Sequence, residues 1–172
     1  MSKYEFWTHG VDIQIEYLDR IVGETGDGRS EPRRSGWGTL VYQKENTTNW
    51  FHFAIPTPVI INNQEASLLF IRLRAEINEN ARIDTIHFRH DNRIFFSQEV
   101  NLSNCSVDET FPVPETVIRR GLALCIHVSF LPGDTRGMVI FKGAGVAFSR
   151  LRQSQMLGAS FFLQGARHRE LL

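Results

Sequence analysis

The chain has 172 residues, enough for one domain with a substantial buried core. Nineteen basic residues balance nineteen acidic ones, so the net charge gives no reason to expect binding to nucleic acid or to an anionic membrane. No apolar run reaches the roughly 18 residues of a membrane-spanning helix, and the first residues lack the pattern of a signal peptide. These features favour a cytoplasmic protein in which Cys105 and Cys125 are reduced.

The predicted elements in the first part of the chain are short strands and loops. Apolar and polar residues alternate over residues 11–17, which predicts a half-buried strand, preceded by a short strand or a bulge at Gly10. Residues 23–36 combine glycine, proline and charges of both signs, which predicts a long exposed loop with local mobility. Residues 37–43 are predicted as a strand, and residues 44–49 as a hairpin turn to its partner.

That partner strand carries aromatic residues and a histidine and ends at two prolines. Phe51, Phe53 and Ile55 share one parity and are predicted to face the core, because successive side chains of a strand point to opposite faces. Trp50 and His52 share the other parity, which predicts an aromatic surface able to form hydrogen bonds. The prolines lack a backbone N–H, so the strand must end there or run along an edge.

The remaining predicted strands are separated by short polar turns. They cover residues 69–77, 83–90, 93–97, 121–131 and 138–148, the last with a glycine-marked bend or bulge. The strand at 121–131 has the clearest alternation, with large aliphatic or aromatic residues at its even positions. Residues 101–115 include prolines and polar residues and are predicted to be mostly loop with a short extended piece.

About eight or nine short strands with regular turns are typical of an all-β fold, an antiparallel β-sandwich or jelly roll. We expect this domain to cover residues 1–148. Residues 149–172 are predicted as a C-terminal tail, helical or irregular, because helix-tolerant residues replace the alternation and Leu157 and Phe161 stand four apart. The tail or a sheet edge is expected to form contacts in a homo-oligomer.

Histidines on or beside the strands are the first candidates for a functional site. His52, His87 and His127, converging on one sheet face, would suit a metal ion or a proton carrier. The sequence contains no HxH or HExxH spacing, and surface or hydrogen-bonded histidines are the more common outcome. The prediction is therefore no metal and no cofactor, with a His-lined small-ligand enzyme or metal-binding protein as the alternative.

Arg72 and Arg74 are the second candidates, because they share one face of a predicted strand. Together with Arg82 or Arg89 from the expected hairpin partner, they would form a site for an anion or a carboxylate. Glu76 lies on the same face and favours a different outcome, a cross-strand ladder of salt bridges.

Trp7, Trp37 and Trp50 are the third candidates, as platforms on which a sugar or another planar ligand stacks, or as core residues that close the sandwich. The sequence contains no nucleophile elbow, Walker loop or G-x-G-x-x-G motif, so no catalytic residue is predicted.

Two segments carry a resemblance to a known family. Residues 36–39, which read GWGT, and residues 49–60, which read NWFHFAIPTPVI, resemble a family of small uncharacterised bacterial β-sandwich proteins. The resemblance covers about residues 4–148 and implies the sandwich fold. It implies no activity, ligand or catalytic residue.

The sequence favours a non-catalytic binding or assembly module that self-associates and binds an unknown small molecule or glycan, but not nucleic acid. The alternatives are the His-lined enzyme or metal protein and a carbohydrate-binding module that uses exposed tryptophans. The candidate ligand-binding residues are Trp37, Trp50, His52, Arg72, Arg74, His87 and His127.

Overall fold

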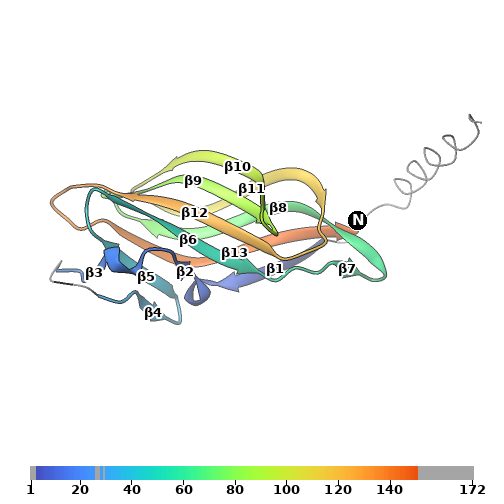
Figure 1. The fold of residues 1–172 in the computed structure, drawn as a ribbon, viewed down its shortest axis with the longest axis horizontal. Helices are drawn as coiled ribbons and strands as arrows, with labels where there is room; N and C mark the ends of the chain where they lie inside the picture. Colours follow the sequence, from blue (N-terminus) through green and yellow to red (C-terminus); the bar gives the residue numbers. More distant parts are fainter. Residues whose placement is uncertain (1–2, 26–27, 29, 151–172) are drawn as a thin grey trace, which may run out of the picture.

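The computed structural model describes residues 3–25, 28 and 30–150, so the predicted tail from residue 151 onward lies outside the described residues. The described chain is an antiparallel β-sandwich of two sheets, whose long strands run along the long axis of the molecule (Figure 1). The all-β prediction is confirmed. No helix in the described part of the chain has the length and apolarity to cross a bilayer.

The larger sheet has eight strands. They are β1 (Lys3–His9), β3 (Ile21–Val22), β4 (Arg33–Ser35), β5 (Gly38–Gln43), β7 (Ile60–Ile61), β8 (Gln64–Ile77), β11 (Cys105–Val117) and β13 (Met138–Arg150). Their order is β11-β8-β13-β5-β3, with β4 also pairing with β5 and β7 with β8. Strand β1 pairs with the second half of β13, whereas β5 pairs with its first half. Strand β13 is therefore at the centre of this sheet.

The smaller sheet has five strands in the order β10-β9-β12-β6-β2. They are β2 (Gln14–Ile15), β6 (Thr47–Ile55), β9 (Ala81–His90), β10 (Arg93–Leu102) and β12 (Leu122–Phe130). Two 3₁₀ helices, η1 (Gly10–Asp12) and η2 (Leu18–Arg20), flank β2. The predicted hairpin between residues 83–90 and 93–97 is confirmed as β9 and β10, and Asp91 takes a positive φ of 59° in its turn.

The core lies between the sheets and follows the predicted parity. Phe51, Phe53 and Ile55 of β6 are buried, as are the even-numbered residues of β12 from Leu122 to Phe130. Aromatic rings connect the layers: Phe141 of β13 lies with its ring centroid 4.7 Å from that of Phe51. Alternation on each strand therefore produces one continuous dry layer, which stabilises the sandwich through burial of apolar area.

Two predicted hairpins are wrong because the chain crosses between sheets at those turns. After β5 the chain passes to β6 in the smaller sheet, and after β8 it passes to β9, so neither pair forms a hairpin. At the second crossing the Asn78 side chain donates to the Arg136 carbonyl at 2.7 Å and accepts from the Met138 N–H at 2.9 Å. Alternation specifies which face of a strand is buried but does not specify the neighbouring strand.

The strand predicted over residues 11–17 is also wrong in its extent. The paired segment before it is β1, and only Gln14 and Ile15 of the predicted strand pair with β6. Between them the chain crosses from the larger to the smaller sheet through η1. At Gly10 a Cβ atom would collide with the Phe141 carbonyl, and the Thr39 hydroxyl donates to the Gly10 carbonyl at 2.9 Å. This close approach fixes the position of the crossing.

Residues 101–115, predicted to be mostly loop, instead belong to two long strands. Strand β10 continues to Leu102, and β11 begins at Cys105 and pairs with β8. Pro112 is tolerated because β11 is an edge strand, where a missing N–H need not break a ladder on both sides. The register of β11 shifts between Pro112 and Thr116. The predicted loop over 23–36 is interrupted by β4, which pairs with β5.

A candidate binding groove on the smaller sheet

The outer face of the smaller sheet gathers the polar and aromatic side chains that alternate with the core residues. Pairing of β6, β12 and β9 places His52, Cys125 and His87 in one row across three strands. The neighbouring row contains Trp50 and His127. The structure therefore places His52, His87 and His127 on one face of this sheet together with Trp50.

The Trp50 indole lies across this face. Its ring centroid is 4.8 Å from that of His87 and 4.9 Å from that of His127. Trp50 belongs to β6 and His87 to β9, so the indole spans the intervening strand β12, since adjacent strands are about 4.8 Å apart. Cys125 lies on β12 between them and is only 5% exposed. Its burial raises the pKa of the thiol, so this cysteine stays protonated near neutral pH.

A groove of about 520 Å³ lies on this face. It is lined by Glu16, Trp50, His52, His87, Arg89, Asp91, Ile94, Ala123 and Cys125, and we refer to these residues as the groove. Most of its walls come from β6, β9 and β12. Three further residues complete the lining: Glu16 directly after β2, Asp91 in the turn between β9 and β10, and Ile94 near the start of β10. It is an open, shallow site with aromatic, apolar and charged lining.

The charged residues of the groove are paired within the protein. Glu16 Oε2 lies 3.2 Å from His52 Nε2. A hydrogen bond from the Tyr17 side chain, followed by the contact with His52, lowers the pKa of Glu16. Asp91 forms an ion pair with Arg120, and Arg89 Nη2 donates to the Asn92 carbonyl at 2.8 Å. A ligand would therefore meet a nearly neutral surface rich in hydrogen-bonding groups.

His87 is kept in its neutral form. Burial is the main cause that lowers its pKa from the ordinary value of 6.5, and the positive charge of Arg89 and the proximity of His127 act in the same direction. The imidazole against the Trp50 ring is accordingly uncharged at neutral pH, with one ring nitrogen able to donate and the other to accept.

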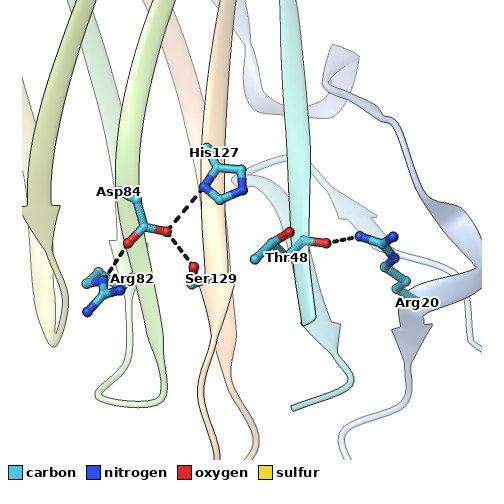
Figure 2. Close-up of polar contacts among 6 residues, drawn as sticks. All are labelled: Arg20, Thr48, Arg82, Asp84, His127 and Ser129. Atoms are coloured by element: carbon cyan, nitrogen blue, oxygen red, sulfur yellow. Dashed lines mark hydrogen bonds and ion pairs between the residues drawn. The ribbon is translucent and has the colours of Figure 1, made fainter. Parts of the chain in front are cut away.

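Asp84 organises a polar cluster with Arg82, His127 and Ser129 (Figure 2), and the His127 ring in turn lies against Trp50. One oxygen of Asp84 accepts a hydrogen bond from Ser129 at 2.6 Å and lies 3.3 Å from His127 Nδ1, and the other is 2.5 Å from Arg82 Nε. The residue types match a serine–histidine–aspartate triad, but the order does not. In a triad the histidine lies between the serine and the aspartate, whereas here Asp84 binds both. The Ser129 hydroxyl is not activated by this arrangement.

The backbone beside Trp50 is fixed from the edge of the sheet. The Glu16 N–H donates to the Trp50 carbonyl at 3.0 Å. Arg20 Nη1 donates to the Thr48 carbonyl at 2.5 Å (Figure 2), and its guanidinium lies 4.0 Å from the centroid of the Tyr17 ring. These contacts satisfy backbone carbonyls of β6 that the two-residue strand β2 does not reach. They therefore fix the position of the strand that carries Trp50.

The other predicted site residues lie elsewhere. Arg72 and Arg74 are on the outer face of the larger sheet, where Arg72 lies 3.7 Å from Glu5 and Arg74 3.6 Å from Asp108. Glu76 pairs with Lys142 on the same face. The salt-bridge ladder therefore forms, although with partners from β1, β11 and β13. The expected neighbours Arg82 and Arg89 belong to the other sheet, because the chain crosses at residues 78–80.

Trp37 is 45% exposed and lies between β4 and β5, away from the groove lining. Among the described residues, no group of three or more histidine, cysteine, aspartate or glutamate side chains is arranged to hold a metal ion. A larger hollow of about 790 Å³ is lined by Leu18, Ser30, Glu31, Pro32 and Arg34. The described residues that line this hollow include no aromatic ring.

Glu16 and Asp84 are not among the residues that the sequence pattern predicts for this face. Glu16 reaches it only because the chain crosses from the larger sheet at η1. Asp84 is the extra residue of a register shift in β9, where Thr85 pairs with His127 and Ile83 with Val128. A regular alternation has no place for such a residue.

Comparisons with solved structures find matches of low sequence identity. A family two carbohydrate esterase from Cellvibrio japonicus is 8% identical with a TM-score of 0.42, and the match covers 87% of this chain and 35% of that one. The xylan-binding module CBM15 is 11% identical with a TM-score of 0.45, and the match covers 81% of this chain and 98% of that module. The carbohydrate-binding module CBM36, solved with calcium and xylotriose, is 11% identical with a TM-score of 0.37, and the match covers 87% of this chain and 100% of that module.

The chain thus spans about a third of the length of the esterase. At these TM-scores the similarities carry no functional argument. A search of curated proteins returns no match. Residues 1–151 match a family described as "Family of unknown function (DUF6623)", which agrees with the predicted membership of an uncharacterised family. The chain belongs to this family.

Proposed function

We propose that the chain is a non-catalytic binding module whose groove holds an uncharged polar ligand, and that this ligand is a carbohydrate. The observation that carries the proposal is the Trp50 indole, held across β12 between the rings of His87 and His127. The face of an indole carries partial negative charge, which attracts the C–H groups on the apolar side of a sugar ring. A ring held in one orientation loses little conformational entropy on binding.

The lining of the groove supports this class of ligand. Its volume of about 520 Å³ falls in the usual range of small-ligand sites, roughly 300–1,000 Å³. Asp91 already has a cationic partner in Arg120, and Glu16 already contacts the His52 imidazole, so a charged ligand would have to compete with these contacts. Hydroxyl groups of a sugar can instead donate to the carboxylates and accept from Arg89 or the neutral His87.

Replacing Trp50 with alanine is expected to weaken binding at the groove by about 2 kcal/mol or more, which is roughly thirtyfold in Kd. Titration calorimetry with cello-, xylo-, manno- and chito-oligosaccharides measures the affinity of the native chain and of the variant. Trp37→Ala is the matched control, because Trp37 is an exposed tryptophan outside the groove. The proposal fails if none of these oligosaccharides binds the native chain, or if Trp50→Ala binds them as the native chain does.

Self-association through a sheet edge is the second part of the proposal. Strand β10 is ten residues long and forms an edge of the smaller sheet, and Ile94 on it is 46% exposed. An edge of this length can pair with a second copy. Sedimentation velocity of the full chain is expected to show a dimer that Ile94→Lys dissociates and Ile60→Lys, on β7 of the other sheet, does not. A native monomer at all concentrations would contradict this.

A further inference from the structure

A second aromatic surface lies on the outer face of the larger sheet, on the opposite side of the sandwich from the groove. Trp7 of β1 is paired with Gly145 of β13, and Gly145 is paired on its other side with Arg72 of β8. Trp7 is 41% exposed, which is unusual for so large an apolar side chain within a strand. It lies at the end of the ladder of ion pairs formed by Arg72 and Arg74.

The floor under the Trp7 ring is peptide backbone. A Cβ atom added to Gly145 would lie 2.7 Å from Trp7 Cδ2, 2.8 Å from Cε2 and 2.9 Å from Cε3. Because these three distances are nearly equal, Gly145 lies under the face of the indole and not at its edge. Gly143, the next outward-facing residue of β13, also lacks a side chain, and its added Cβ would be 3.9 Å from Trp7 Cε3. The indole therefore lies flat on β13, and the opposite face is the one turned to solvent.

The edge of the ring is held as well. The Glu5 carboxylate accepts hydrogen bonds from the side chains of Lys3 and Trp7, and Arg72 Nη1 lies 3.7 Å from Glu5 Oε2. On the next row Arg74 is paired with Asp108 at 3.6 Å, with more than half of its side chain exposed. A flat aromatic surface is thus bordered by guanidinium donors and carboxylate acceptors.

We infer that Trp7, on its glycine floor and bordered by Glu5, Arg72 and Arg74, is a second carbohydrate-binding platform, so that the chain carries two independent sites on opposite faces. A sugar ring stacks on the free face of the indole while its hydroxyls accept from the arginines and donate to Glu5. The cations and carboxylates here are paired, which disfavours a polyanionic ligand such as nucleic acid. The ligand class rests on the proposed function; the existence and independence of this platform do not.

Binding stoichiometry per chain tests the inference. Titration calorimetry with the four oligosaccharide series named above is expected to give two sugars per native chain, one for Trp7→Ala, one for Trp50→Ala and none for the double variant. Gly145→Ala retains Trp7 but places a methyl group against its ring, and it is expected to weaken the second site at least tenfold. Acrylamide quenching in a Trp37→Phe, Trp50→Phe chain, where Trp7 is the sole tryptophan, should decrease when the sugar is added.

The outcomes separate the two proposals. One sugar per native chain, unchanged by Trp7→Ala, overturns the second platform and leaves the groove intact. If adenosine protects Trp7 from acrylamide quenching and none of the oligosaccharides does, the carbohydrate assignment of this platform is overturned. No sugar binding to the native chain overturns both proposals. Circular dichroism of each variant shows whether it is folded, so that a loss of binding caused by misfolding is recognised as such. Gly145→Ala is a second, independent variant that perturbs the same site.

Discussion

Replacing Phe141 with alanine is expected to lower the free energy of unfolding by about 3–5 kcal/mol, a large part of the stability of a domain of this size. Phe141 is fully buried on the central strand β13 of the larger sheet. Its ring contacts Phe51 and Phe53 of the smaller sheet, with centroid distances of 4.7 Å and 6.1 Å. Truncation leaves a cavity between the layers that rigid sheets cannot collapse to fill.

Urea-induced unfolding followed by fluorescence measures this loss. Phe70→Ala is the matched control, because Phe70 lies on the outer face of the larger sheet beneath Lys3 and Arg72 and is only half-buried. Its loss is expected to stay near 1 kcal/mol or below. Phe141→Leu, which conserves most of the volume, should cost less than about 1.5 kcal/mol. Equal losses for Phe141→Ala and Phe70→Ala would mean that the layers are not joined at Phe141.

Asn49→Ala is expected to cost about 3 kcal/mol, although it removes only one polar side chain. Asn49 is fully buried and forms three hydrogen bonds. Its Oδ1 accepts from the Tyr17 N–H at 3.0 Å, and its Nδ2 donates to the Tyr17 carbonyl at 3.0 Å and to Gln43 Oε1 at 2.7 Å. Gln43 is itself buried and donates to Thr47 at 2.8 Å. Each group left unsatisfied inside the protein costs about 1–3 kcal/mol.

Chemical denaturation again gives the measurement, with Asn101→Ala on exposed β10 as the control. Asn49 also positions the neighbouring residue Trp50, because it ties β6 to the segment that carries Glu16. We therefore expect the oligosaccharide affinity of Asn49→Ala to decrease as well. A variant as stable as Asn101→Ala would show that water readily replaces the Asn49 side chain.

The buried faces of the strands were predictable from the sequence, and the strand neighbours were not. The odd positions from Phe51 to Ile55 and the even positions of β12 are buried as the alternation predicts. The same alternation is satisfied whether a strand pairs with the preceding strand or crosses to the opposite sheet. Only contacts distant in sequence, such as those of Gly10 with Phe141 or of Asn78 with Met138, distinguish the two arrangements.

The candidate site was predictable to a similar degree. Parity brought Trp50, His52 and His127 to one face, because β6 and β12 are regular neighbours. Asp84 could not be assigned by parity, since it is the extra residue of an irregular register. Arg72 and Arg74 were expected beside Arg82 or Arg89. They are not neighbours, because β8 and β9 belong to different sheets and do not form the predicted hairpin. The Trp7 ring lies flat on β13 only because Gly143 and Gly145 lack side chains. These glycines are more than a hundred residues away in the sequence, so no local pattern could reveal the contact.

The central position of β13 has a consequence for how this protein forms during translation. Strand β13 separates β8 from β5 and β1 in the larger sheet, yet it is the last strand of the described chain to leave the ribosome. Until it emerges, the nascent polypeptide holds β8 and β5 with unpaired edges and with apolar faces toward solvent. Assembly of the larger sheet therefore waits until β13 has been synthesised, and until then the exposed strands favour aggregation over folding.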